Sequence, residues 1–229
     1  TPTKVKVCIL AVGVARPSVE RVMKNLKTTH DSFLKTGHEI SHYAFPYKDS
    51  FENEIKKQNP PYVKLNFIDP ITKEIGSHPL SINSYRMVKS IQTAHESIRN
   101  PERFDVIVRH RLDFEVNSIQ VPNELSENTY YSAHADSTGI YDNFGLCSPS
   151  LFKRIWNADT PNRFKEKNNE AMLLAQVRRL NARLKVINFE VTGYQSSDKT
   201  WNGIPQWSKR ARKWISKEGD SDISRVRYD

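Results

Sequence analysis

The sequence has little cysteine and no long apolar run. Its 229 residues include two cysteines, Cys8 and Cys147, and both lie in apolar surroundings. This pattern favours buried free thiols over a disulfide framework. No stretch approaches the roughly 18 apolar residues of a membrane-spanning helix, and the first residues lack the charged and apolar regions of a signal peptide. We therefore expect a cytoplasmic protein with no transmembrane segment.

Two common nucleotide-binding motifs are also missing. The sequence contains neither G-x-G-x-x-G nor G-x-x-x-x-G-K-[ST], which argues against a dinucleotide-dependent dehydrogenase and a P-loop NTPase. What the chain has in excess is positive charge, with 35 Lys and Arg against 26 Asp and Glu and a net charge of +9. Such a charge suits nucleic acid, an anionic membrane surface or a phosphorylated small molecule.

Part of this charge is concentrated near the end of the chain. The segment 207–217 carries five basic residues and no acidic one. Trp207, Ala211, Trp214 and Ile215 recur at helical spacing, which predicts a helix. We favour a helix that packs on the domain by its tryptophan face, with peripheral contact to anionic lipid as the alternative. The sequence thus predicts one domain over 1–195 and a basic tail over 196–229.

The rest of the chain alternates strands and helices. Val5 to Val12 is a nearly continuous apolar run, typical of a buried parallel strand. A helical pattern follows up to Gly37, and Ile40 to Phe45 predicts a second strand. Strand–helix–strand units imply a parallel sheet, so we predict a single α/β domain. Further helices are expected over 49–57, from a cap at Ser81 or Asn83 to 98, over 148–157 and from 168 or 169 to 181, with strands over 62–68, 104–108, 129–133 and 185–191.

Two polar groups follow predicted central strands. Gly13 and Arg16 come after the first strand, and Arg111 and Asp113 come after the strand 104–108. Ligands of open α/β sheets bind beyond the carboxyl ends of the strands. Arg111 and Asp113 are two residues apart, so both can face one pocket. An arginine there can bind a diphosphate, and an aspartate can hold a divalent cation or a ribose hydroxyl.

Two carboxylates are candidates for acid–base chemistry. Asp142, in the run Tyr-Asp-Asn-Phe-Gly, can act as a general base or serve as a turn residue. Glu170 opens a predicted helix, where its charge suits the helix dipole. It can also act as a base on the acceptor side.

One motif points to different chemistry. The run from His38 to His42 matches H-E-x-x-H, the pattern of zinc proteases. That chemistry needs both histidines on one helical turn. Here the run leads into a predicted strand, which would turn Glu39 away from both histidines. A zinc hydrolase is therefore a remote alternative.

Taken together, these residues resemble bacterial and viral glycosyltransferases of the GT-A fold that carry R-x-D in place of D-x-D. Four blocks match in order, within about residues 4–192. They read VCILAVGVARPSVERVMKNL, YRMVKSIQTAHESIRNPERFDVIVRHRLDFEV, YDNFGLCSPSLFKRIW and NEAMLLAQVRRLNARLKVINF.

The resemblance implies a donor site. It places Gly13, Arg16, Arg111 and Asp113 against a sugar nucleotide. It implies that the helix from Ser84 to Lys89 lines the donor pocket through Ser84, Tyr85 and Lys89, and that Asp142 lies near the sugar and the acceptor. Arg111 stands where an aspartate is usual, so a cofactor Mn²⁺ or Mg²⁺ held by Asp113 is an open question.

The activity expected from this resemblance is transfer of a hexosyl or pentosyl group. The donor would be a nucleoside diphosphate sugar, with a UDP-sugar as first choice, and the acceptor a hydroxyl of a glycan or glycoconjugate. The main alternative is a basic nucleic-acid-binding α/β protein, which would line one face with basic and aromatic residues.

Overall fold

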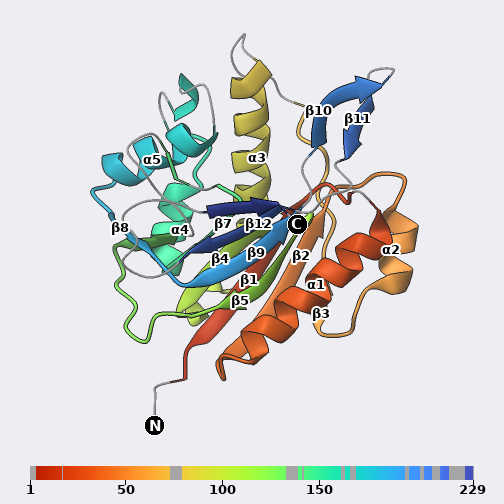
Figure 1. Ribbon diagram of the computed structural model, residues 1–229. Coiled ribbons are helices and arrows are strands. Elements are labelled where there is room, and N and C mark those ends of the chain that lie inside the picture. Colours follow the sequence, from red (N-terminus) through yellow and green to blue (C-terminus); the bar gives the residue numbers. More distant parts are fainter. Residues whose placement is uncertain are drawn as a thin grey trace.

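The computed structural model describes most of the chain (Figure 1). The described residues are 4–16, 18–72, 79–132, 139–140, 142–160, 163–165, 169–193, 196–201, 204–207, 212–216 and 225–228. Side chains are described for these residues except 79–81 and those after 193.

A central sheet of seven strands, mostly parallel, organises the fold. The strand order is β3-β2-β1-β4-β7-β6-β8. The strands are β1 (Lys6–Gly13), β2 (Glu39–Pro46), β3 (Val63–Leu65), β4 (Val106–Arg111), β6 (Thr129–Ser132), β7 (Phe144–Cys147) and β8 (Arg183–Val186). Only the β4–β7 and β7–β6 pairs are antiparallel. The predicted α/β class with a mostly parallel sheet is confirmed.

Helices cover both faces of this sheet. The helices are α1 (Val19–Leu34), α2 (Glu52–Gln58), α3 (Pro79–Glu96), α4 (Pro149–Ile155) and α5 (Asn169–Arg179), with short 3-10 turns at Pro101–Arg103 and Arg163–Lys165. β1 is buried on both sides, as its apolar run predicts. Leu10 belongs to the core formed with α3, α4 and α5, and Ala11 to the core formed with α1. Among the described residues, no helix combines the length and apolar character needed to cross a bilayer.

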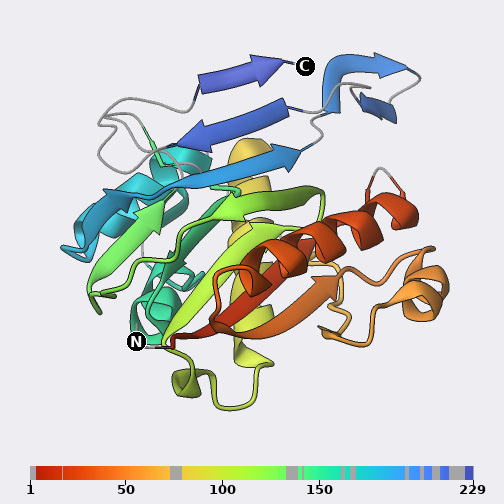
Figure 2. The same cartoon turned by 60° about the horizontal axis from the view of Figure 1, so that its bottom comes forward.

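A second sheet lies over the α1 side (Figure 2). Its order is β13-β12-β9-β5, from β5 (Phe114–Ile119), β9 (Phe189–Gly193), β12 (Arg212–Ser216) and β13 (Arg225–Tyr228). β10 (Ser196–Trp201) and β11 (Ile204–Trp207) form a separate hairpin. β5 follows β4 after a two-residue turn, so the chain changes sheets at Leu112 and Asp113.

Three sequence predictions need correction here. The predicted strand 185–191 is two strands, β8 and β9. α3 begins at Pro79, so Ser81 and Asn83 lie inside the helix and do not cap it. The described residues within 207–217 are strand where a helix was predicted, with Trp207 ending a strand and Arg212–Ser216 forming β12.

The tail segment joins the fold through strand pairing. Arg212 to Ser216 pair with Gly193 to Phe189 in an antiparallel ladder. Tryptophan and isoleucine favour strands, and a short apolar pattern does not distinguish a strand from a helix without knowledge of its partner. The division of the chain at residue 195 stays a prediction.

Candidate functional site

The corner between β4 and β5 is the centre of the site. β4 extends to Arg111, three residues beyond the predicted strand end, and Val12 of β1 lies opposite Arg111 in the parallel register. Asn25 of α1 donates a hydrogen bond from Nδ2 to the carbonyl oxygen of Leu112 over 3.0 Å. The helix thereby fixes the turn that carries Asp113.

Asp113 joins the two polar groups that the sequence singled out. The Arg111 guanidinium donates to both carboxylate oxygens, from Nε to Oδ1 over 2.8 Å and from Nη2 to Oδ2 over 2.5 Å. Arg16 Nε reaches Oδ2 over 3.3 Å. The Asp113 side chain is only 3% exposed, whereas those of Arg111 and Arg16 are 29% and 37% exposed. The carboxylate therefore holds two arginines that still face solvent.

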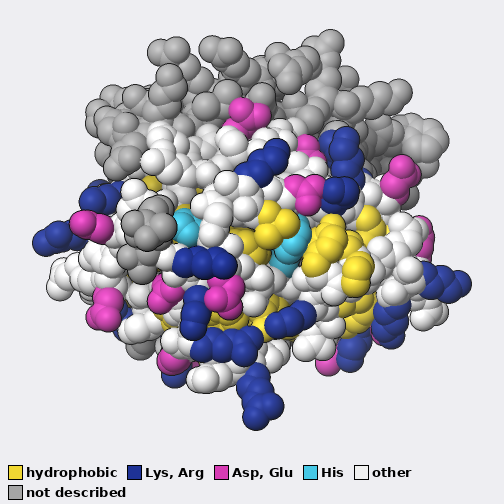
Figure 3. Space-filling model, turned by 90° about the horizontal axis from the view of Figure 1, so that it is seen from below, with side chains coloured by type: hydrophobic (Ala, Val, Ile, Leu, Met, Phe, Trp, Pro, Cys, Tyr) yellow, Lys and Arg dark blue, Asp and Glu magenta, His cyan; other side chains and the backbone are white. Residues whose placement is uncertain are grey.

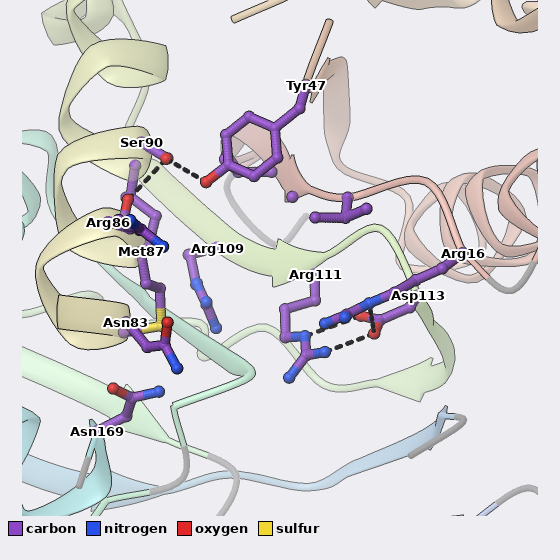
Figure 4. A pocket seen from close by; sticks show the side chains of 14 residues that line it. Arg16, Tyr47, Asn83, Arg86, Met87, Ser90, Arg109, Arg111, Asp113 and Asn169 are labelled. Carbon is purple, nitrogen blue, oxygen red and sulfur yellow. Dashed lines mark hydrogen bonds and ion pairs between the residues drawn. The ribbon is translucent and has the colours of Figure 1, made fainter. Parts of the chain in front are cut away.

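These residues border a cavity of about 280 Å³. It lies between the carboxyl ends of β1 and β4 and the face of α3 (Figure 4). Its described lining residues are Val12, Gly13, Val14, Arg16, Tyr47, Asn83, Arg86, Met87, Ser90, Ile91, Arg109, Arg111, Asp113 and Asn169. Four of these are arginines and one is a carboxylate, so the cavity has a strong excess of positive charge.

Gly13 gives the cavity room at the end of β1. Its φ of +142° is a conformation that favours glycine, and a Cβ built there would meet no atom within 4 Å. Gly13 lines the cavity with open space beside its Cα, and its predicted role in letting the backbone approach a ligand stays a prediction.

α3 turns a different face to the cavity from the one expected. Ser84 donates from Oγ to Asn169 Oδ1 over 2.5 Å, and the Tyr85 ring packs edge-on against Phe164. Lys89 donates to Gln92 over 3.3 Å. None of the three predicted residues is in the described lining.

The side chains of α3 that do line the cavity are Asn83, Arg86, Met87, Ser90 and Ile91. Each lies one or two positions along the helix from a predicted residue. The apolar pattern of a helix does not reveal a rotation of this size about its axis when polar side chains also line the cavity.

Sequence reasoning missed two arginines and a tyrosine. Arg109 is 2% exposed, and its guanidinium lies 5.3 Å from the centroid of the Trp156 ring. Figure 4 shows it between α3 and the Arg111–Asp113 pair. The strand alternation of Arg109 and Arg111 could have indicated this, because residues two apart share a face. Tyr47 contacts Ser90 through their hydroxyls at 2.5 Å and so connects the end of β2 to α3.

The two candidate bases, Asp142 and Glu170, lie near the Arg111 guanidinium group. Arg111 Nη1 donates to Asn143 Oδ1 over 3.0 Å, which places Asp142 next to an arginine-bound residue. Asp142 is buried, with 4% exposure. Partial desolvation of the carboxyl and then the nearby Asp142 carboxylate raise the pKa of Glu170. Neither carboxylate is in the described lining, although Asn169 beside Glu170 is.

A divalent cation fits these residues poorly. Mg²⁺ binds oxygen ligands at about 2.0–2.1 Å, and both Asp113 oxygens already accept hydrogen bonds from guanidinium groups. A cation on either oxygen would lie against those positive charges. In the described part of the chain, no group of three or more His, Cys, Asp or Glu side chains could hold a metal.

In the H-E-x-x-H run, Glu39 to His42 form the start of β2 and His38 lies just before it, in agreement with the predicted strand. The His42 side chain on β2 is buried, and its ring lies 5.7 Å from that of His30 on α1 and 6.0 Å from that of His110 on β4, between ring centroids. Within the described part of the chain, neither ring nitrogen of His42 has a hydrogen-bond partner. Burial lowers the pKa of His42, and it lowers that of His110 to about 4.

Comparisons with known proteins give structural likenesses only. No family model matches the sequence, and no curated protein matches it. One similar structure is a glycosyltransferase involved in glycosylation of the major capsid of PBCV-1, with a TM-score of 0.45, 11% identity and coverage of 79% of this chain and 80% of that one.

Two further structures are similar. An active-site mutant of LgtC has a TM-score of 0.48 and 10% identity, covering 80% of this chain and 72% of that one. A mutant of Drosophila β-1,4-galactosyltransferase 7, in complex with manganese, UDP-Gal and xylobiose, has a TM-score of 0.44 and 10% identity, covering 79% and 64%. Because all three TM-scores are below 0.5, a functional assignment for this chain depends on its own site.

Proposed function

We propose that this chain is a glycosyltransferase that moves a sugar from a nucleoside diphosphate sugar to a hydroxyl of a glycan or glycoconjugate. The observation that carries the proposal is the arginine-lined cavity at the carboxyl ends of β1 and β4. A UDP-sugar is our first choice of donor.

The charge of the cavity suits the departing group of this reaction. Cleavage of the bond between sugar and diphosphate leaves negative charge on the diphosphate, and positive groups already in place stabilise that charge. Arg16 and Arg111 are held at the cavity by Asp113, so they need little rearrangement. Arginine can bind phosphate oxygens through two parallel hydrogen bonds.

The acceptor hydroxyl needs a base if the reaction inverts the anomeric centre. Asp142 is our first candidate and Glu170 the second. Asn143, beside Asp142, contacts Arg111, and Asn169, beside Glu170, lines the cavity. Both carboxylates therefore come from segments that border the donor cavity.

The alternative of nucleic-acid binding finds less support. It calls for basic residues gathered along one face with aromatic platforms. On the face seen in Figure 3, Lys and Arg side chains are interspersed with Asp and Glu. The arginines of the cavity instead line a space of about 280 Å³, close to the lower end of the range of small-molecule pockets.

The proposal is tested with isothermal titration calorimetry of UDP, GDP and their sugar conjugates. One nucleotide should bind with a Kd in the micromolar range, and its sugar conjugates should differ in affinity according to the sugar. A transfer or hydrolysis assay should then show release of that nucleotide. Absence of binding by all of these ligands would refute the proposal.

A further inference from the structure

We infer that this chain binds the diphosphate of its donor without a divalent cation, and that Asp113 is a positioning residue for two arginines. This inference rests on the proposed function and names how the same site handles negative charge.

The first argument is the occupancy of Asp113. Its two oxygens together accept three hydrogen bonds, two from Arg111 and one from Arg16. The carboxylate is buried, and such hydrogen bonds and ion pairs offset the cost of removing it from water. A metal ion bound to either oxygen would displace a guanidinium hydrogen bond. The ion would then lie beside the positive charges of Arg111 and Arg16.

The second argument is the charge of the cavity. Its described lining holds Arg16, Arg86, Arg109 and Arg111 against the single carboxylate of Asp113, an excess of three positive charges. A released nucleoside diphosphate carries roughly −2.5 to −3 near neutral pH, because the second ionisation of a terminal phosphate has a pKa near 6. The arginines can therefore neutralise the leaving group in the way that a cation would.

The third argument is the arrangement of these arginines. Arg16 and Arg111 lie on the β1 and β4 side of the cavity, Arg86 lies beside α3 on the other side, and Arg109 lies between them (Figure 4). A bound diphosphate would have guanidinium groups on two sides. Asp113 holds Arg16 and Arg111, the two arginines on the β1 and β4 side. Its role is therefore to set the geometry of these two side chains.

The test is calorimetric titration of the full chain with UDP and with GDP, first in EDTA and then in excess Mn²⁺. We expect the Kd of the nucleotide that binds to differ by less than about threefold between the two conditions. Binding that appears only with Mn²⁺, or that improves tenfold or more with it, would overturn this inference and leave the proposed function standing. Binding in neither condition would overturn both.

A variant separates a positioning role from metal ligation. Asp113→Asn removes the charge that holds the arginines, so nucleotide binding should weaken roughly tenfold, and by the same factor in EDTA and in Mn²⁺. If Asp113 were a metal ligand, the loss would appear only in Mn²⁺, and that result would refute the inference. Asp105→Asn is the control, because Asp105 lies just before the opposite end of β4 and accepts a hydrogen bond from the backbone of Lys6. It should bind like the unchanged chain.

Discussion

The guanidinium of Arg111 binds both carboxylate oxygens of Asp113, at 2.8 Å and 2.5 Å, across the turn that joins β4 to β5. A further hydrogen bond goes to Asn143, the residue just before β7. A single side chain thus joins the corner of the first sheet to the segment that carries Asp142. In the proposed function, this contact joins the donor-binding arginines to the segment of the candidate base.

Replacing Arg111 by lysine should break this connection while keeping the charge. A lysine ammonium is a single donor centre and cannot span both Asp113 oxygens and Asn143 together. We expect the affinity for UDP to fall at least tenfold in Arg111→Lys, measured by calorimetry. Arg103→Lys is the matched control, since Arg103 lies on the surface and bonds to the Tyr43 hydroxyl. Equal affinities in the two variants would contradict a role for the Arg111 guanidinium in joining Asp113 and Asn143.

The face of α3 gives a second prediction. Arg86 lines the cavity, whereas Lys89, one turn along the same helix, bonds to Gln92 outside it. Both changes to alanine remove one positive charge from α3 at little cost to the helix. Arg86→Ala should weaken UDP binding about tenfold or more, since hydrogen bonds to charged groups contribute about 1.5–3 kcal/mol.

Lys89→Ala is the control for Arg86→Ala and should bind UDP within about twofold of the unchanged chain. Calorimetry at moderate ionic strength separates local contact from general attraction, because long-range effects are screened there. The reverse result would place the donor on the face of α3 that the sequence suggested.

The alternation of strands and helices was predictable because it follows from local patterns. The apolar run before Gly13 and the helical repeat up to Gly37 each indicate one element, and β1, α1 and β2 lie where these patterns place them. The convergence of Arg16, Arg111 and Asp113 was also predictable, because carboxyl ends of neighbouring parallel strands meet at one edge.

What the sequence did not reveal depends on contacts between distant segments. β12 forms as a strand against β9, and without that partner its tryptophan and basic residues fit a helix equally well. Arg86 on α3 faces the cavity because of how the helix is rotated on the sheet, and packing sets that rotation. Arg109 was overlooked because a buried arginine in a central strand is rare unless a site requires it.

The buried histidines predict loss of stability in acid. The pKa of His110 is about 4 and that of His42 is lowered, in both cases because burial disfavours the charged ring. In the unfolded chain both should titrate near pH 6.5. Above pH 6.5 both states hold neutral rings and there is no effect. Below it the unfolded state gains protons first, so the free energy of unfolding falls as the pH drops from 6.5 towards 4.

The change His42→Leu should reduce this dependence. One such histidine contributes up to about 1.4 kcal/mol per pH unit inside the window. The leucine also removes a buried ring whose nitrogens have no hydrogen-bond partner, so stability at pH 7 should rise by about 1 kcal/mol. Urea unfolding at pH 7, 6, 5 and 4.5 measures both effects, with His38→Gln as the control, because His38 is only partly buried and lies before β2. Identical pH profiles in His42→Leu and the unchanged chain would refute this account.

The two candidate bases can be separated by a pair of isosteric changes. Asp142→Asn should lower turnover roughly 100-fold or more, the usual contribution of a general base, while UDP binding stays within about threefold. Glu170→Gln should have a smaller effect. If Glu170 were the base, kcat would fall on the acid side through its raised pKa, and Glu170→Gln would remove that limb of the profile. A nucleotide-release assay across pH 5–8 on both variants decides the assignment. A large loss in Glu170→Gln with near-normal turnover in Asp142→Asn would exchange the two roles.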